Sequence, residues 1–448
     1  MNNKRPYIIQ FVCILTMLIV IMLQGFTHVV KMKPLSSIDQ VKDWNIKPTF
    51  ENYLNGSYQT YLTGKAKRNT GFREFFIRNY NQLVYSCFGK STNLHVKEGL
   101  NHELYLKMYL NEVTGKTLEE KCGSVEEAKA QAQRNVEETM RLIDTLQSHG
   151  TKFLFVFAPS KTWVYPEYMP KYYHERMTDF SLEEYYIDLF KENNIPHIDF
   201  LDYFKSIKDE APYPLYTRTG THWAEWTIPF VADSILRKME TITDYTLPGI
   251  QIVDENLTTE YSKQDRELES SMNLLFPLDK PALPRPVFAL TDAENADKPN
   301  LLIVGDSYFV QLKESPFVKA FNHWDYWMYN KDSYSSRPYY EGKHLEYMFD
   351  AAEVLEDADI VMAVFTNVFI YDYMAGFTQS AQELFEKGTM GEQETLLKTM
   401  EMIKADAKWY QAIEKQAQER GISVEENLRR NAKFVMEQNK KKKEQLND

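Results

Sequence analysis

The stretch LLIVGDSYF, residues 301–309, joins an apolar run to a glycine, an acid and a serine. The run Leu301–Val304 predicts a buried strand, because no polar residue interrupts it. Gly305 lets the chain turn sharply after this strand, which leaves Ser307 exposed at the start of the next helix. The N–H of Ser307 and a neighbouring N–H can then point at a developing oxyanion. The alternative is structural, with Asp306 simply capping that helix.

Strands and helices alternate on both sides of this stretch. Apolar runs predict further strands at Lys152–Ala158, His197–Phe200, Asp325–Tyr329 and Ile360–Phe365. Helices are predicted at Ser124–His149, from Ser181, and at His222–Thr241, Phe309–Phe321 and Leu345–Leu355. Capping boxes mark three helix starts: Ser124 with Glu127, Ser181 with Glu184, and Ser423 with Glu426. This alternation predicts an α/β fold, a mostly parallel sheet with helices on both faces.

Polar residues gather where the predicted strands end, which is where open α/β sheets bind ligands. His222, in the segment Gly220-Thr221-His222-Trp223, is the best base for a serine nucleophile, and the alternative is a capping or packed ring. Ala158-Pro159-Ser160-Lys161 either lines the same cleft or is a loop rich in turn formers. Five residues are predicted to stabilise an anion or contact substrate: Tyr308, Lys161, Trp223, Thr366 and Asn367.

The N-terminus predicts a membrane anchor. Lys4 and Arg5 precede an uncharged apolar stretch, Tyr7 to about Val30, which is long enough to cross the hydrocarbon layer. The basic residues should stay in the cytoplasm, so the rest of the chain is exported. A cleaved signal peptide is the alternative, although Gln24-Gly25-Phe26-Thr27-His28 is a poor cleavage site.

Composition excludes several classes of protein. Aromatic residues make up 14% of the 448 residues, enough to build a core and to argue against disorder. The net charge is −12, and it becomes −16 without the four basic residues of 1–33, which argues against nucleic-acid binding. No HExxH or CxxC motif is present, so we expect neither a metal nor a cofactor. Cys87 and Cys122 could form one disulfide.

Three segments in this order also carry a family resemblance: FAPSKTWVYPEYMP at 157–170, TGTHWAEW at 219–226 and LLIVGDSYF at 301–309. They resemble the alginate O-acetylation proteins (the AlgX/AlgJ-like group) and the related DHHW-type proteins. The resemblance extends over most of residues 50–430. It implies an exported, SGNH-hydrolase-like (flavodoxin-like) protein, often paired with a membrane-bound O-acyltransferase.

The resemblance also implies roles for individual residues. Ser307 matches the family's nucleophile and His222 its base, but the family has an aspartate where this chain has Gly220. The aspartate normally fixes the histidine tautomer and stabilises the imidazolium. Its absence either weakens catalysis or is compensated by a backbone carbonyl or another acid. We expect Gly220 to leave an open space beside the histidine nitrogen that faces away from Ser307.

Two functions fit these observations. The first is a membrane-anchored O-acetyltransferase or acetylesterase acting on a bacterial envelope polysaccharide. The second is a catalytically degenerate module that binds glycan or docks the acyltransferase. The predicted domains are residues 1–33 (cytoplasmic stub and anchor), 34–123 (linker and helical segment), 124–379 (SGNH-hydrolase-like domain with an irregular excursion at 245–298) and 380–448 (helical tail).

Overall fold

The computed structural model describes residues 5–36, 46–292, 294–330, 332–337, 343–345, 351–387, 392–420 and 422–447. Two compact units make up the chain. The first is Met1–Val96 with Leu268–Asp279, and the second is Lys97–Glu267 with Lys280–Asp448. This division falls at other positions than the predicted domain boundaries, which stay a prediction.

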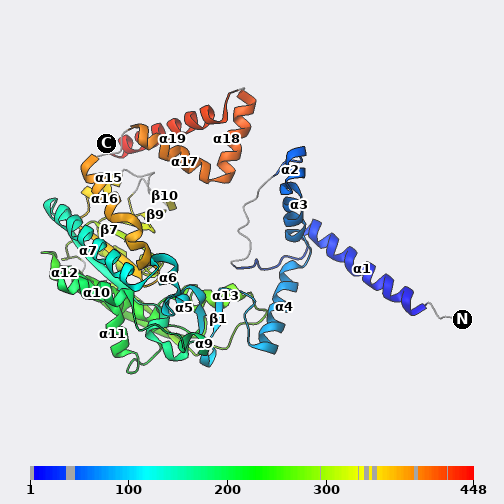
Figure 1. Cartoon of the computed structure of the whole chain (residues 1–448), viewed down its shortest axis with the longest axis horizontal. Helices are drawn as coiled ribbons and strands as arrows, with labels where there is room; N and C mark the ends of the chain where they lie inside the picture. The colour runs from blue at the N-terminus through cyan, green and yellow to red at the C-terminus, as the bar shows by residue number, and fades with distance from the viewer. Residues whose placement is uncertain are drawn as a thin grey trace. The chain divides into compact units, whose positions relative to one another are not determined.

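A seven-stranded sheet forms the centre of the second unit (Figure 1). In spatial order its strands are β10 (Lys343–Leu345), β9 (Asp332–Ser335), β8 (Trp324–Met328), β7 (Leu301–Gly305), β11 (Ile360–Thr366), β3 (Lys152–Ala158) and β4 (His197–Asp199). The five strands from β8 to β4 are parallel. Strand β9 pairs antiparallel with β8, and β10 pairs antiparallel with β9. The predicted mostly parallel sheet and its five predicted strands are therefore confirmed.

The central strands are buried on both faces, which explains why they read as continuous apolar runs. Successive side chains of β11 point to opposite faces of the sheet. Met362 and Val364 enter one hydrophobic core, whereas Val361, Ala363 and Phe365 enter the other. In register, Thr366 of β11 lies opposite Ala158 of β3. The carboxyl ends of these strands therefore share one edge of the sheet.

Helices cover both faces. Those that contribute to the first core are α5 (Lys107–Val113), α8 (Lys161–Val164), α11 (Phe200–Ile207), α12 (Ile228–Ile242) and α14 (Phe309–Lys313). Those that contribute to the second are α6 (Lys116–Cys122), α7 (Val125–Ser148), α10 (Leu182–Glu192), α15 (Ala351–Glu356) and α16 (Phe377–Lys387). Smaller elements of this region are β1 (Val96–Glu98), β2 (Leu104–Leu106) and α9 (Lys171–His174).

Capping residues place the helix starts as predicted. The Ser124 hydroxyl accepts a hydrogen bond from the N–H of Glu127, and Ser181 and Ser423 make the equivalent bonds to Glu184 and Glu426.

Three helix predictions need correction. The helix predicted from His222 begins only at Ile228, and His222 lies in the loop before it. The helix predicted at Phe309–Phe321 is interrupted, because Pro316 starts a separate 3-10 helix, η5 (Pro316–Ala320). The helix predicted at Leu345–Leu355 does not begin at Leu345, which ends β10. Its part from Ala351 is helical, and residues 346–350 lie outside the described residues.

The excursion at 245–298 is more regular than predicted. Strands β5 (Gly249–Thr258) and β6 (Leu283–Thr291) pair as an antiparallel hairpin with a bulge between Ile252 and Asp254. Pro284 and Pro286 suggested irregular structure, but a two-stranded ribbon has outer edges that need no N–H donor. Between the strands lie the 3-10 helix η4 (Gln264–Arg266) and α13 (Glu267–Met272).

The first unit is mainly helical, in line with the helical segment predicted within residues 34–123. Its helices are α1 (Arg5–Thr27), α2 (Phe50–Leu54), α3 (Ser57–Arg68) and α4 (Arg73–Phe88). Asn81 of α4 donates hydrogen bonds to the carbonyls of Met272 and Asn273 in the same unit. Within α1, Pro6–Thr27 is long and apolar enough to cross a membrane, with a mean hydropathy of 2.5.

The chain after Ser380 is helical wherever the structure describes it, as predicted. Helices α17 (Glu392–Ala405), α18 (Ala407–Arg420) and α19 (Val424–Asn447) follow α16. They lie side by side, orange to red in Figure 1, around a small apolar cluster of their own.

Candidate active site

Ser307 lies in a tight turn after β7. A Cβ on Gly305 would come within 2.7 Å of the Val364 carbonyl oxygen, so only glycine fits this position. The fully buried Asp306 carboxylate accepts hydrogen bonds from the N–H of Tyr308 at 3.0 Å and of Thr366 at 2.7 Å. Asp306 thereby ties the end of β7 to the end of β11. Asp306 therefore does not cap α14, whose N-cap residue is Tyr308. Ser307 itself is half-buried.

The structure brings Ser307 and His222 together across 85 positions of sequence. The Nε2 atom of His222 lies 3.0 Å from the Oγ atom of Ser307, within hydrogen-bonding distance. Two buried rings hold the histidine loop in place. Trp223 packs edge-on against Tyr308, and the Tyr308 hydroxyl donates a 2.7 Å hydrogen bond to the Thr221 carbonyl.

Glu267, which no sequence motif singled out, completes the arrangement. Its Oε1 atom lies 3.0 Å from Nδ1 of His222 and accepts a 2.7 Å hydrogen bond from the N–H of Thr221. Glu267 is the first residue of α13, 45 positions after the histidine. It supplies the acid that the resemblance places at position 220.

Gly220 does not leave the open space that we expected. A Cβ at this position would lie 2.7 Å from both the Gln264 carbonyl oxygen and the Thr217 hydroxyl. The hydroxyls of Thr217 and Thr219 donate hydrogen bonds to the Asp265 carbonyl, which closes this loop around Gly220. An aspartate therefore has no room at this position.

Buried acids surround the histidine and set its charge. Burial lowers the pKa of His222, but the carboxylates of Glu267, Asp306 and Asp265 together raise it more, so that the pKa lies above the ordinary 6.5. Burial raises the pKa of Asp306, opposed by its hydrogen bonds from Tyr308 and Thr366. Burial and nearby Glu225 raise the pKa of Asp265 to about 7. The site thus favours the protonated histidine, the state that forms when a base has taken a proton.

Tyr329 also contacts the serine, although the sequence did not indicate it. Burial raises the pKa of the Tyr329 phenol, and the neighbouring Ser307 opposes that rise. Tyr329 has φ of +55°, an uncommon conformation for a bulky residue. Its N–H donates a 2.8 Å hydrogen bond to the Gly305 carbonyl, and its ring packs against Phe369. Such strained positions are often found at functional sites.

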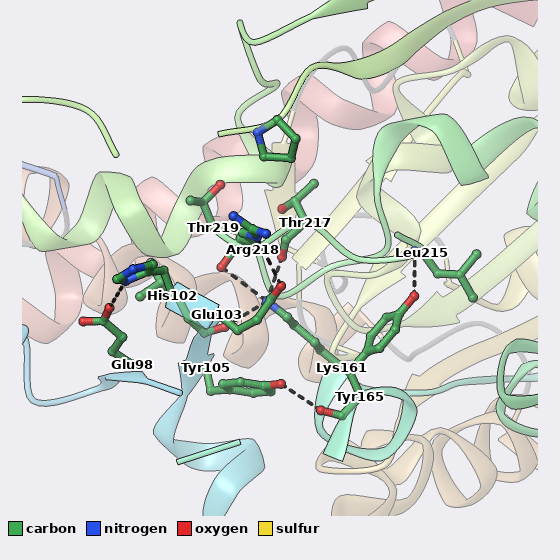
Figure 2. Close-up of polar contacts among 12 residues, drawn as sticks. Glu98, His102, Glu103, Tyr105, Lys161, Tyr165, Leu215, Thr217, Arg218 and Thr219 are labelled. Atoms are coloured by element: carbon green, nitrogen blue, oxygen red, sulfur yellow. Dashed lines mark hydrogen bonds and ion pairs between the residues drawn. The ribbon is translucent and has the colours of Figure 1, made fainter. Parts of the chain in front are cut away.

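Lys161 lies inside the protein rather than on the rim of a cleft, which corrects the prediction. Its side chain is 3% exposed, and Nζ lies 2.6 Å from Oε2 of Glu103. Nζ also donates hydrogen bonds to the carbonyls of Leu104 and Thr217. Figure 2 shows Lys161 pointing between Glu103 and the backbone of Thr217 and Arg218. Lys161 thereby anchors the segment that leads to His222.

The other predicted rim residues are buried too. Tyr308, Trp223, Thr366 and Asn367 are fully buried, and their contact with substrate stays a prediction. The side-chain amide of Asn367 donates a hydrogen bond to Glu112, which also accepts one from Trp163 at 2.7 Å. These residues pack the end of the sheet.

Metal-ligating residues are not clustered in the part of the chain that the structure describes. No group of three or more His, Cys, Asp or Glu side chains there could hold an ion. Cys87 and Cys122 are free thiols here and belong to different units, so the disulfide considered above stays a prediction.

Comparisons with known proteins agree with this fold. Residues 118–313 match the family model for the SGNH hydrolase-like domain of the acetyltransferase AlgX. No curated protein matches the chain significantly.

The solved structures that are similar to this chain share little sequence with it. The O-acetyltransferase domain of Pseudomonas putida AlgJ is 15% identical, with a TM-score of 0.38 over 64% of this chain and 99% of that one. Pseudomonas aeruginosa AlgX is 12% identical, with a TM-score of 0.39 over 64% of this chain and 67% of that one. A DHHW family protein from Eubacterium siraeum is 11% identical, with a TM-score of 0.32 over 54% and 88%.

These findings confirm the resemblance suggested by the motifs at Ser307 and His222. The matched segment contains both residues as well as Glu267. The chain has an SGNH hydrolase-like fold, and its residues 118–313 are similar to the SGNH hydrolase-like domain of the acetyltransferase AlgX.

Proposed function

We propose that this protein is a membrane-anchored, exported serine O-acetyltransferase or acetylesterase that acts on a cell-envelope polysaccharide. The observation that carries the proposal is the chain of contacts from Ser307 through His222 to Glu267, with 3.0 Å at each step. A nucleophile, a base and an acid that orients the base are the parts that acyl transfer needs. The alternative of a degenerate binding module depended on Gly220, which stands where the family has an aspartate. The position of Glu267 beside His222 argues against that alternative.

The proposed reaction has two halves. In the first, His222 Nε2 takes the hydroxyl proton of Ser307 as Oγ attacks the carbonyl carbon of an acetyl donor. The bond to the leaving group breaks, and His222 returns the proton to it. In the second, His222 takes a proton from a sugar hydroxyl or from water, whose oxygen attacks the acetyl-serine and releases Ser307 Oγ, which regains a proton.

Acetylation of Ser307 itself is the direct test. We expect the full chain, incubated briefly with p-nitrophenyl acetate and quenched in acid, to carry an acetyl group on the peptide that contains Ser307. Mass spectrometry of the digested protein measures this. An acetyl group found only on lysine side chains, or p-nitrophenolate release without any acetyl-serine, would contradict the proposed covalent step.

Tyr329 is proposed to stabilise the oxyanion together with the N–H of Ser307, because its phenol lies beside Ser307. Tyr329→Phe removes the phenol and leaves the N–H, so we expect kcat/KM for p-nitrophenyl acetate to fall about tenfold to a hundredfold. Tyr172→Phe, which removes an exposed phenol, is the matched control. Equal kcat/KM in both variants would exclude the role of Tyr329.

The apolar helix α1 supports the proposed location in the bacterial cell membrane, with the remaining chain outside the cytoplasm. A reporter that fluoresces only in the cytoplasm, fused after Asp448, should therefore stay dark. The same reporter fused to a chain that begins at Lys33 should fluoresce. A bright fusion to the whole chain would exclude export and with it the envelope substrate.

A membrane-bound O-acyltransferase is the proposed partner, because the resemblance implies it and because the acetyl donor must reach an exported enzyme. The proposed substrates are polysaccharides rather than nucleic acids, given the net charge of −12.

A further inference from the structure

A cavity of about 620 Å³ lies beside the β5–β6 hairpin in the second unit. The hairpin forms one wall, and the start of η3 (Glu225–Thr227), η4 and the α14–η5 segment form the others. Its volume falls within the roughly 300–1,000 Å³ typical of small-molecule sites.

The cavity is built from the same three segments as the Ser307–His222–Glu267 arrangement. Gln311 follows Ser307 by four residues, Gln264 precedes Glu267 by three, and Glu225 follows His222 by three, and all three line the cavity. Gln311 also donates a 3.2 Å hydrogen bond from Nε2 to the carbonyl of Trp223, the neighbour of His222. A ligand in the cavity would therefore lie against the segments that position the reacting groups.

One buried acceptor in this wall has no partner. Gln311 is only 8% exposed, and its Oε1 atom has no hydrogen bond from any described residue. A buried amide oxygen is costly unless a donor satisfies it. A hydroxyl or an amide N–H of a ligand in the cavity would supply that donor. Asn256, Thr258 and Ser262 add further polar groups to the lining.

Charge in the lining is balanced. Two cations, Lys263 and Arg285, face two anions, Glu225 and Glu314, and Arg285 lies 3.5 Å from Glu225. A uronate or phosphate would add a negative charge that this lining does not neutralise. A neutral ligand rich in hydroxyls fits both the charge balance and the polar groups.

We propose that this cavity binds a neutral sugar unit of the substrate glycan, which excludes uronate polymers as the preferred substrate. The buried Ile228 and Phe288 supply apolar surface for the C–H face of a sugar ring. The inference rests on the proposed function for its biological meaning. The binding itself is testable without catalysis.

The test uses the full chain carrying Ser307→Ala in detergent micelles, titrated calorimetrically with tetrasaccharides. The probes are cellotetraose and chitotetraose as neutral glycans, and tetramannuronate and tetragalacturonate as acidic ones. We expect a neutral tetrasaccharide to bind more tightly than either uronate. Val287→Trp should fill the cavity from β6 and weaken that binding at least tenfold.

Val253→Trp is the matched control, because Val253 is equally exposed on the same hairpin but does not line the cavity. Thr258→Trp is a second filling variant, should Val287→Trp unfold. Tighter binding of the uronates, binding of none of the four probes, or equal weakening by Val253→Trp and Val287→Trp would overturn the proposal. The binding test uses Ser307→Ala and so does not depend on catalysis. If the unaltered chain fails to turn over esters, that result contradicts the proposed function but not the proposed sugar binding.

Discussion

Ser307→Ala is expected to reduce turnover of p-nitrophenyl acetate to background, a fall of up to about 10⁶-fold. The reason is that, among the described residues, Ser307 supplies the hydroxyl at the histidine: its Oγ atom is 3.0 Å from Nε2 of His222. Alanine keeps the backbone of the turn, so the hydrogen bonds that Asp306 accepts from Tyr308 and Thr366 should remain. The variant should therefore fold like the unaltered chain.

Initial rates of p-nitrophenolate release, with thermal unfolding measured in parallel, check this expectation. Ser206→Ala is the matched control, because it removes an exposed serine hydroxyl from α11 that donates only to the Tyr203 carbonyl. Turnover by Ser307→Ala above one-tenth of the unaltered rate, in a folded protein, would mean that esters react elsewhere on the chain.

The sheet could be predicted from the sequence because its strands are buried on both faces. Successive residues of β3 and β11 enter opposite cores, so both strands are apolar except for Lys152 at the start of β3 and Thr366 at the end of β11. Such runs are recognisable in a single sequence. The β5–β6 hairpin was missed because it is mostly exposed, and its strands therefore contain charged residues and prolines.

The site could be predicted only in part, because its residues come from distant segments. Ser307 and His222 stand in recognisable motifs, whereas Glu267 and Tyr329 follow no motif and reach the site through tertiary structure. The burial of two predicted contact residues could not be predicted either. Lys161 and Asn367 do end strands near the site, but sequence position does not show that Glu103 and Glu112 bind them inside the protein.

Glu267→Ala is expected to lower kcat/KM for the same ester by about 10⁴-fold, as removal of the acid does in serine proteases. Glu267→Gln should cost less. Oε1 of Glu267 accepts a hydrogen bond from the N–H of Thr221 and also faces Nδ1 of His222. An amide would keep its oxygen toward Thr221, so that the histidine tautomer is preserved and only the negative charge is lost. Glu210→Gln, on an exposed loop, controls for loss of an acid.

The pH dependence separates this role from simple support of the fold. His222 acts as a base only when neutral, so activity is lost as pH falls through its pKa, which Glu267 holds above 6.5. Without the Glu267 carboxylate, burial lowers that pKa with less opposition, since only Asp306 and Asp265 still raise it. The acid limb of kcat/KM should therefore move to lower pH in Glu267→Gln, while the maximal rate falls. A merely structural glutamate would lower the rate without moving the limb, and that outcome would leave His222 and Ser307 as a dyad.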